Sequence, residues 1–182
     1  MEGLGEGNTV PQDTNFTFTV KATDDTTKAK VQKYGALDAA GEVTPGQYKI
    51  DGSQETVKFE NGAATVTVTV KQGQNTASIT ILGLPVGQYT VTENISDTSF
   101  PKDIGIYTFD EVTYSVSDFG NNEDTNKVFT LQSPKEEADT LTIQTTTVTA
   151  TNKYVEGVRE LLVKKTVEGD MGDTTQDFDF TL

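Results

Sequence analysis

Hydrophobic and polar residues alternate one by one along most of this chain, and Thr is the usual polar partner. A two-residue period predicts β-strands that bury one face and leave the other wet. Turn-forming runs rich in Gly, Asn and Pro separate the alternating segments. The clearest alternation occurs in FTFTV (16–20), ATVTVTV (64–70), ASITIL (77–82), YTVTE (89–93), VTYSV (112–116) and TTTVTAT (145–151).

The spacing of these segments predicts the fold class. The strands follow one another too closely for βαβ units, and residues 28–41 have room for a helical turn but no clean helical period. We therefore expect an all-β protein, an Ig-like antiparallel β-sandwich.

An internal repeat suggests how the chain is organised. EGLGEGNTVPQDTNFTFTV (2–20) and EGDMGDTTQDFDFTL (168–182) share Glu-Gly, a Gly-rich turn, Gln-Asp and a Phe-x-Phe-Thr strand. LLVKKTV (161–167) precedes the second copy, whereas the first copy begins at Met1, where such a strand should end. We expect residues 1–157 to form a sandwich without its own first strand. Residues 158–182 would be the first strand and start of a following repeat, or a donated strand.

Alternation also predicts which polar side chains point inward. In YTVTE, Glu93 shares a face with Tyr89 and Val91, opposite the wet Thr face. In VTATN (148–152), Asn152 shares a face with Val148 and Ala150. In LLVKKTV, Lys165 lies on the drier face with Leu161 and Val163.

A buried Lys, Glu and Asn together suggest one reaction. Burial makes Lys165 neutral and nucleophilic and keeps Glu93 protonated. Lys165 would attack the side-chain carbonyl of Asn152, Glu93 would polarise that carbonyl and shuttle protons, and ammonia would leave. The alternative for each residue alone is a polar strand end that reaches solvent, and Lys at a sheet edge also discourages aggregation.

Composition excludes several other classes of function. The net charge of −14 disfavours nucleic acid and anionic membranes as partners. The chain has neither Cys nor His, so it lacks disulfides, thiolate chemistry and the commonest general base and metal ligand. A hydrolase would need a pair of carboxylates, and spacing marks none. We expect no cofactor and no metal.

Several motifs resemble those of the Cna B-type, pilin-like domains of Gram-positive surface proteins, and most closely the second domain of the streptococcal backbone pilin family. They are LLVKK (161–165), GDTTQDFDF (172–180), TVPQDTNFTF (9–18), LPVGQYTVTE (84–93) and TATNK (149–153). In that family a Lys and an Asn form a spontaneous isopeptide bond and a Glu catalyses it. The resemblance therefore implies that Lys165 and Asn152 form the cross-link and that Glu93 is catalytic.

The order of the strands departs from the family pattern. There the Lys strand comes first in its own domain, whereas here it follows the Asn strand, so by analogy Lys165 would pair with an Asn beyond residue 182. Residues 153–160 span at most about 26 Å, and a parallel return normally needs a dozen residues or more. We therefore expect LLVKKTV to be donated to a neighbouring copy, head to tail.

The sequence thus predicts a structural stalk or pilin module, extracellular and attached to the cell wall, with a signal and an anchor outside these residues. Its partners would be neighbouring copies of the chain or adjacent repeats. It would not be an enzyme beyond a single self-crosslinking turnover. The alternative is an adhesin module that binds a host protein or glycan through its loops, with Tyr34, Tyr107 or Phe119 as candidate contacts.

Overall fold

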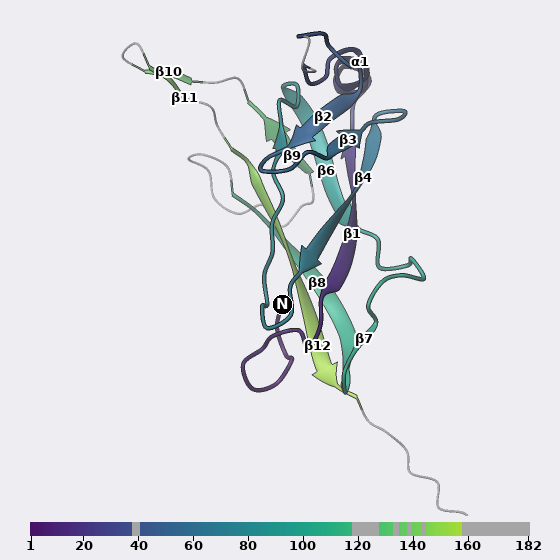
Figure 1. Cartoon of the computed structure of the whole chain (residues 1–182). Coiled ribbons are helices and arrows are strands. Elements are labelled where there is room, and N and C mark those ends of the chain that lie inside the picture. The colour runs from purple at the N-terminus through teal and green to yellow at the C-terminus, as the bar shows by residue number, and fades with distance from the viewer. Residues whose placement is uncertain (38–40, 118–127, 133–134, 138–139, 143–144, 158–182) are drawn as a thin grey trace, which may run out of the picture.

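The computed structural model describes residues 1–37, 41–117, 128–132, 135–137, 140–142 and 145–157. Within these ranges the chain is mostly β, with antiparallel sheets and one short helix, which confirms the predicted class at this level (Figure 1). The elements are β1 (Thr14–Ala22), α1 (Asp25–Lys33), β2 (Gln47–Ile50), β3 (Thr56–Lys58), β4 (Ala63–Val70), β5 (Ile81–Leu82), β6 (Gly87–Glu93), β7 (Asp103–Ile104), β8 (Tyr107–Ser117), β9 (Val128–Leu131), β10 (Lys135–Glu137), β11 (Thr140–Thr142) and β12 (Thr147–Glu156). The predicted strand 161–167 and the predicted second unit 158–182 lie outside the described residues.

The largest sheet has the order β4-β1-β6-β9, and every neighbouring pair in it is antiparallel. β1 lies inside this sheet, with Phe18 opposite both Val66 of β4 and Glu93 of β6. The alternation in FTFTV has its predicted effect, because Phe16 and Val20 are buried. Period-two patterning therefore sets the buried face of this sheet.

A second sheet has the order β12-β8-β7. β12 pairs with β8 from Thr147 opposite Ser117 to Glu156 opposite Tyr107, with a register shift between Lys153 and Tyr154. β12 therefore lies at one edge of this sheet. The described residues contain two smaller sheets as well, β3-β2-β5 and the hairpin β10-β11.

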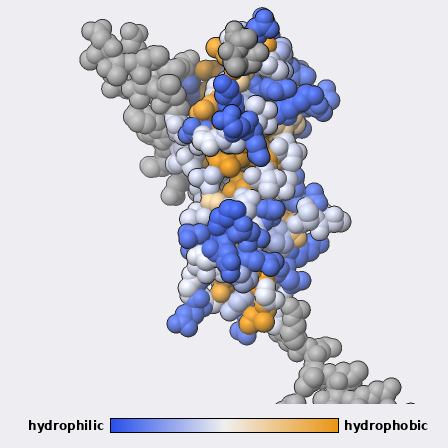
Figure 2. All heavy atoms as spheres, in the orientation of Figure 1, coloured by the Kyte–Doolittle hydropathy of each residue, from blue (hydrophilic) through white to orange (hydrophobic). Residues whose placement is uncertain are grey.

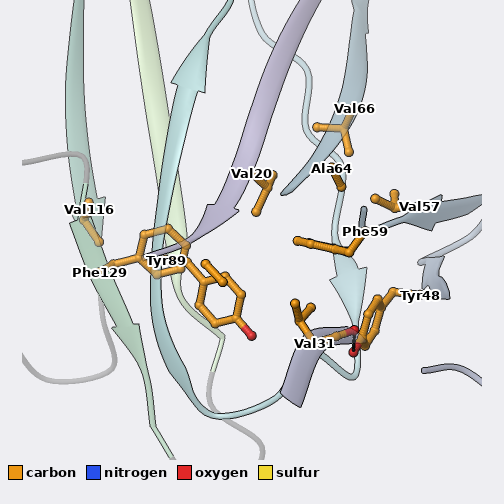
Figure 3. Packing of buried hydrophobic residues seen from close by; sticks show 11 residues of the cluster. Val20, Val31, Tyr48, Val57, Phe59, Ala64, Val66, Tyr89, Val116 and Phe129 are labelled. Carbon is orange, nitrogen blue, oxygen red and sulfur yellow. Dashed lines mark hydrogen bonds between the residues drawn. The ribbon is translucent and has the colours of Figure 1, made fainter. Parts of the chain in front are cut away.

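Two hydrophobic clusters form the core. The helix-end cluster joins side chains of the two larger sheets, of α1 and of β2 and β3: Val20, Ala22, Val31, Tyr48, Val57, Phe59, Ala64, Val66, Tyr89, Val116 and Phe129 (Figure 3). The N-terminal cluster consists of Leu4, Val10, Phe16, Val70, Phe100, Ile104 and Tyr154. Since β6 and β8 both contribute to the helix-end cluster, the two larger sheets pack with their apolar faces toward each other.

The helix α1 is longer than the sequence indicated and starts earlier. Asp24 caps it by accepting a hydrogen bond from the Thr27 backbone N–H at 2.8 Å. Thr27 and Val31, one turn apart, are its buried residues. With so narrow a buried stripe, the segment carries no clear helical period, which explains why no more than a turn was expected within 28–41.

The predicted strand ASITIL is only partly formed. Ile81 and Leu82 make up β5, but residues 77–80 are not in a strand. Ile79 and Ile81 nevertheless pack against the helix-end cluster, as the alternation predicts. The pattern therefore predicted the buried face correctly, while over 77–80 the backbone hydrogen bonds amount to one, from the Asp51 N–H to the Thr80 carbonyl at 2.9 Å, which is too few for a strand.

The N-terminal residues pair with β12 in parallel. The Glu2 backbone N–H donates to the Asn152 carbonyl at 2.9 Å, and the Tyr154 N–H donates to the Glu2 carbonyl at 2.9 Å. Gly3 has φ +85° and lies so close to the Tyr154 carbonyl that a Cβ would fall 1.8 Å from that oxygen. Glycine at this position is what lets the N-terminal segment approach β12.

The visible surface is largely hydrophilic. Figure 2 shows hydrophilic residues over both halves of one face, with small hydrophobic patches near mid-height and at the lower end. No helix in the described ranges is long and apolar enough to cross a membrane.

Candidate functional site

Glu93 is the last residue of β6, and its side chain is buried between the two larger sheets. It follows Tyr89 and Val91 on the inward face of the strand, and only 2% of its surface is exposed. This is the orientation that the alternation in YTVTE predicts. A carboxyl at this position cannot reach solvent, so the alternative of a solvated strand end is wrong for Glu93.

Asn152 lies on the inward face of β12, where Val148 and Ala150 precede it and Tyr154 follows. Only 3% of its surface is exposed, which again matches the predicted orientation and excludes a solvated strand end. The next residue, Lys153, points the other way and pairs with Asp110 at 2.8 Å and Glu111 at 3.4 Å. The amine of Lys153 is therefore held on the outer face of this sheet.

The structure brings Glu93 and Asn152 into direct contact. Asn152 Nδ2 donates a hydrogen bond of 2.8 Å to Glu93 Oε1. The remaining side-chain oxygens of this pair, Glu93 Oε2 and Asn152 Oδ1, are buried and have no hydrogen-bond partner among the described residues. Buried polar atoms normally find partners, so two such oxygens side by side point to a function rather than to packing.

The surroundings favour the neutral form of the carboxyl. Burial raises the pKa of Glu93 above its ordinary value, and the hydrogen bond from Asn152 offsets only part of that effect. The Glu93 backbone N–H donates to the Tyr114 hydroxyl at 2.8 Å, which ties β6 to β8 beside the site. A protonated Glu93 is suited to donate a proton to an amide carbonyl.

The Glu93–Asn152 pair lies between the two hydrophobic clusters. Val91 and Val148 pack on the helix-end cluster, whereas Tyr154 belongs to the N-terminal cluster. Phe18, which is opposite Glu93 in the sheet, packs against both clusters. Apolar walls on both sides keep water away, which strengthens every electrostatic interaction within the site.

The third predicted residue of the site, Lys165, lies outside the described residues. The structure therefore brings together two of the three predicted site residues, and Lys165 in the site stays a prediction. In the described part of the chain, no group of three or more Asp or Glu residues is placed to hold a metal ion.

Sequence reasoning missed one contact of the site. Tyr114 accepts the hydrogen bond from the Glu93 backbone, although only its inward direction was visible from the alternation in VTYSV. Hydroxyl contacts between sheets depend on how the sheets pack, and the period of a single strand carries no such information.

The aromatic residues considered for an adhesin do not gather at one place. Tyr34, which is 50% exposed, directly follows α1, whereas Tyr107 is the first residue of β8, next to β7. α1 and β7 lie toward opposite ends of the described chain (Figure 1). Phe119 lies outside the described residues. The two candidate tyrosines, Tyr34 and Tyr107, therefore do not form a shared binding surface.

Comparisons with known families, with curated proteins and with solved structures found no match to this chain. The likeness to Cna B-type domains therefore depends on the sequence motifs alone.

Proposed function

We propose that this chain is a structural module of a bacterial surface stalk or pilin, folded as an Ig-like, Cna B-type β-sandwich. In this proposal the module is extracellular and cell-wall-attached, and it cross-links itself through an isopeptide bond between Lys165 and Asn152. The observation that carries the proposal is the buried contact of Asn152 Nδ2 with Glu93 Oε1 at 2.8 Å. The other two side-chain oxygens of this pair have no hydrogen-bond partner in the described part of the chain.

The proposed reaction needs no cofactor. A half-turn of the Asn152 side-chain amide exchanges Nδ2 and Oδ1, so that protonated Glu93 donates to Oδ1 and polarises the carbonyl. The neutral amine of Lys165 attacks Cγ, which forms the new C–N bond. Glu93 carries a proton from the attacking nitrogen to Nδ2, the Cγ–Nδ2 bond breaks, and ammonia leaves.

The site supports this chemistry better than a purely structural role. A Glu–Asn pair kept only for stability would be expected to satisfy its buried oxygens, because each unpaired polar atom costs about 1–3 kcal/mol. Glu93 Oε2 and Asn152 Oδ1 are instead without partners among the described residues. In the proposed reaction, Asn152 Oδ1 accepts the hydrogen bond that polarises the carbonyl, and the Glu93 carboxyl, to which Oε2 belongs, carries the proton.

The intact mass of the denatured chain tests the proposal. We expect a loss of one ammonia for each bond, either within a monomer or at each junction of a covalent multimer. Lys165→Ala and Asn152→Ala should keep the mass calculated from their sequences, without loss of ammonia. Glu93→Gln should form the isopeptide bond at least about 100-fold more slowly, as expected when a general acid–base is removed. An unmodified mass for the natural chain, or ammonia loss in Lys165→Ala, would show that this bond does not form.

A further inference from the structure

One edge of β12 carries unpaired backbone groups directly beside the site. β12 pairs with β8 along its whole length, but on its other edge only Asn152 and Tyr154 form backbone hydrogen bonds, both with Glu2. Over the described residues, Thr147–Thr151 make no backbone hydrogen bond on that edge. Such an edge accepts an additional strand.

The Glu2 pairing fixes the direction and register of that additional strand. Glu2 lies opposite Lys153 in a parallel bridge. Glu168-Gly169 is the repeat of Glu2-Gly3, so a strand in the same register places residue 168 at the position of Glu2. Counting back along both strands, Lys165 falls opposite Ala150, and residues 162–166 lie along Thr147–Thr151.

This register also matches the faces of the two strands. Ala150 shares the inward face with Asn152, so Lys165 would point into the same interior. A shift of two residues along neighbouring strands puts the Lys165 and Asn152 Cα atoms about 8 Å apart, which the long side chain of Lys can bridge. Val163 would lie opposite Val148, which packs on the helix-end cluster. Leu162, Lys164 and Thr166 would follow the outward Thr positions of β12.

The same chain cannot place its own residues in this register. From Glu156 back to Thr147 is about 30 Å along the strand. The six residue steps from Glu156 to Leu162 span at most about 22 Å even without a turn. Residues 162–166 can therefore reach this register only on a neighbouring molecule.

We propose that residues 162–166 of a second copy dock in parallel along Thr147–Thr151 and place Lys165 opposite Ala150. Charge supports this occupant, because residues 158–166 carry three basic residues and one acidic residue, whereas the whole chain has a net charge of −14. The inference deepens the proposed function and rests on it, since the docked strand supplies the lysine of that site. Repeated docking passes the C-terminal strand of each copy to the next copy and builds a head-to-tail fibre.

Paired cysteines test the register without interference from native thiols, because the natural chain has none. In a Lys165→Ala background, Lys164→Cys with Thr149→Cys places two outward Cα atoms about 5 Å apart in the proposed register, within disulfide range. Lys164→Cys with Thr147→Cys is the matched control, since its Cα atoms would be about 8 Å apart, beyond that range. Thr166→Cys with Thr151→Cys is a second matched pair.

After mild oxidation, we expect a ladder of disulfide-linked multimers on a non-reducing denaturing gel for both matched pairs. The control pair, Lys164→Cys with Thr147→Cys, should yield at least tenfold less of these disulfide-linked multimers. No multimers from either matched pair, or equal yields from matched pair and control, would overturn the docking.

Intact mass then separates this inference from the proposed function. A register-specific ladder with no ammonia loss in the natural chain would mean that the strand docks but the bond does not form. Ammonia loss confined to monomers would mean that the bond forms within one chain, which overturns the docking by a second copy.

Discussion

β6 and β12 each supply one residue of the site, but they are held very differently. β6 lies between β1 and β9 and is paired with β1 from Tyr89 to Glu93 and with β9 from Gly87 to Thr90. In the described part of the chain, β12 is paired along one edge by β8 and on the other edge only at Glu2. The Glu93 carboxyl thus ends a strand that two neighbouring strands hold in place. The Asn152 amide sits on a strand whose second edge is open over Thr147–Thr151 among the described residues. In the proposed reaction, the incoming amine would therefore approach Asn152 from the open edge of β12, while Glu93, the proposed proton carrier, is held on β6.

The largest expected effect on stability comes from removing a buried side chain of β6. Tyr89 of β6 is fully buried, stacks on Phe129 and donates its hydroxyl proton to the Pro85 carbonyl at 2.8 Å. Tyr89→Ala should lower the free energy of unfolding by about 3–5 kcal/mol in urea denaturation. Val155→Ala on β12, where the side chain is 43% exposed, is the control and should cost less than about 1 kcal/mol. Equal losses would mean that the two strands do not differ in this way.

The next largest effect on stability comes from removing the side-chain amide of Asn152. Asn152→Ala in a Lys165→Ala background removes the donor to Glu93 and should cost about 1–3 kcal/mol, because the buried carboxyl loses its partner. Thr151→Ala, the adjacent outward residue, should change stability by less than about 1 kcal/mol. If Asn152→Ala were neutral in thermal unfolding, its hydrogen bond to Glu93 would not contribute to stability.

The third effect concerns the only contact that pairs the open edge of β12 among the described residues. Gly3→Ala should lower stability by more than about 1 kcal/mol, because φ is positive and the added methyl group meets the Tyr154 carbonyl. Gly7→Ala has nearly the same positive φ, but no atom lies within 4 Å of its Cβ, so it isolates the backbone term. Unfolding midpoints that fall equally for both variants would show that the approach of Gly3 to β12 contributes nothing.

The smallest effect is a change in pH dependence. Burial raises the pKa of Glu93, so the folded chain holds this proton more tightly than the unfolded chain. The resulting stabilisation is complete below about pH 4.3, the ordinary value for Glu, and is lost as the pH rises through the folded pKa.

Glu93→Gln should remove this decline, which one proton limits to about 1.4 kcal/mol per pH unit. The test is the difference in unfolding free energy between Lys165→Ala and Lys165→Ala/Glu93→Gln across pH 4–8. A difference that does not vary with pH would mean that Glu93 titrates normally.

Alternation in single strands predicted much of this molecule and also shows where such prediction ends. Glu93 and Asn152 are both buried because each follows two inward residues of a Thr-rich strand, and that direction is visible in the sequence. Their contact is not visible there, since it depends on how the two sheets face each other. The residues 77–80 alternate equally well yet lie outside a strand, because pairing requires a neighbour that a local pattern cannot supply.

Patterning indicated no more than a turn of helix α1 and did not find the short strands β2 and β3. α1 buries only Thr27 and Val31, and β2 and β3 have four and three residues, too few to establish a period. The position of Lys165 depends on residues that the structure does not describe, so its role stays a prediction.

The parallel bridge between Glu2 and β12 determines how the module responds to tension. Met1 precedes the bridge at one side and Glu156 follows it at the other, and both strands run in the same direction. Pulling Met1 and Glu156 apart slides the two parallel strands past each other. The hydrogen bonds of Glu2 with Asn152 and Tyr154 then bear the force together instead of opening one after the other. A longer strand along the same edge would add further hydrogen bonds that are loaded in shear at the same time. The force needed to separate the two strands would therefore grow with the length of that strand.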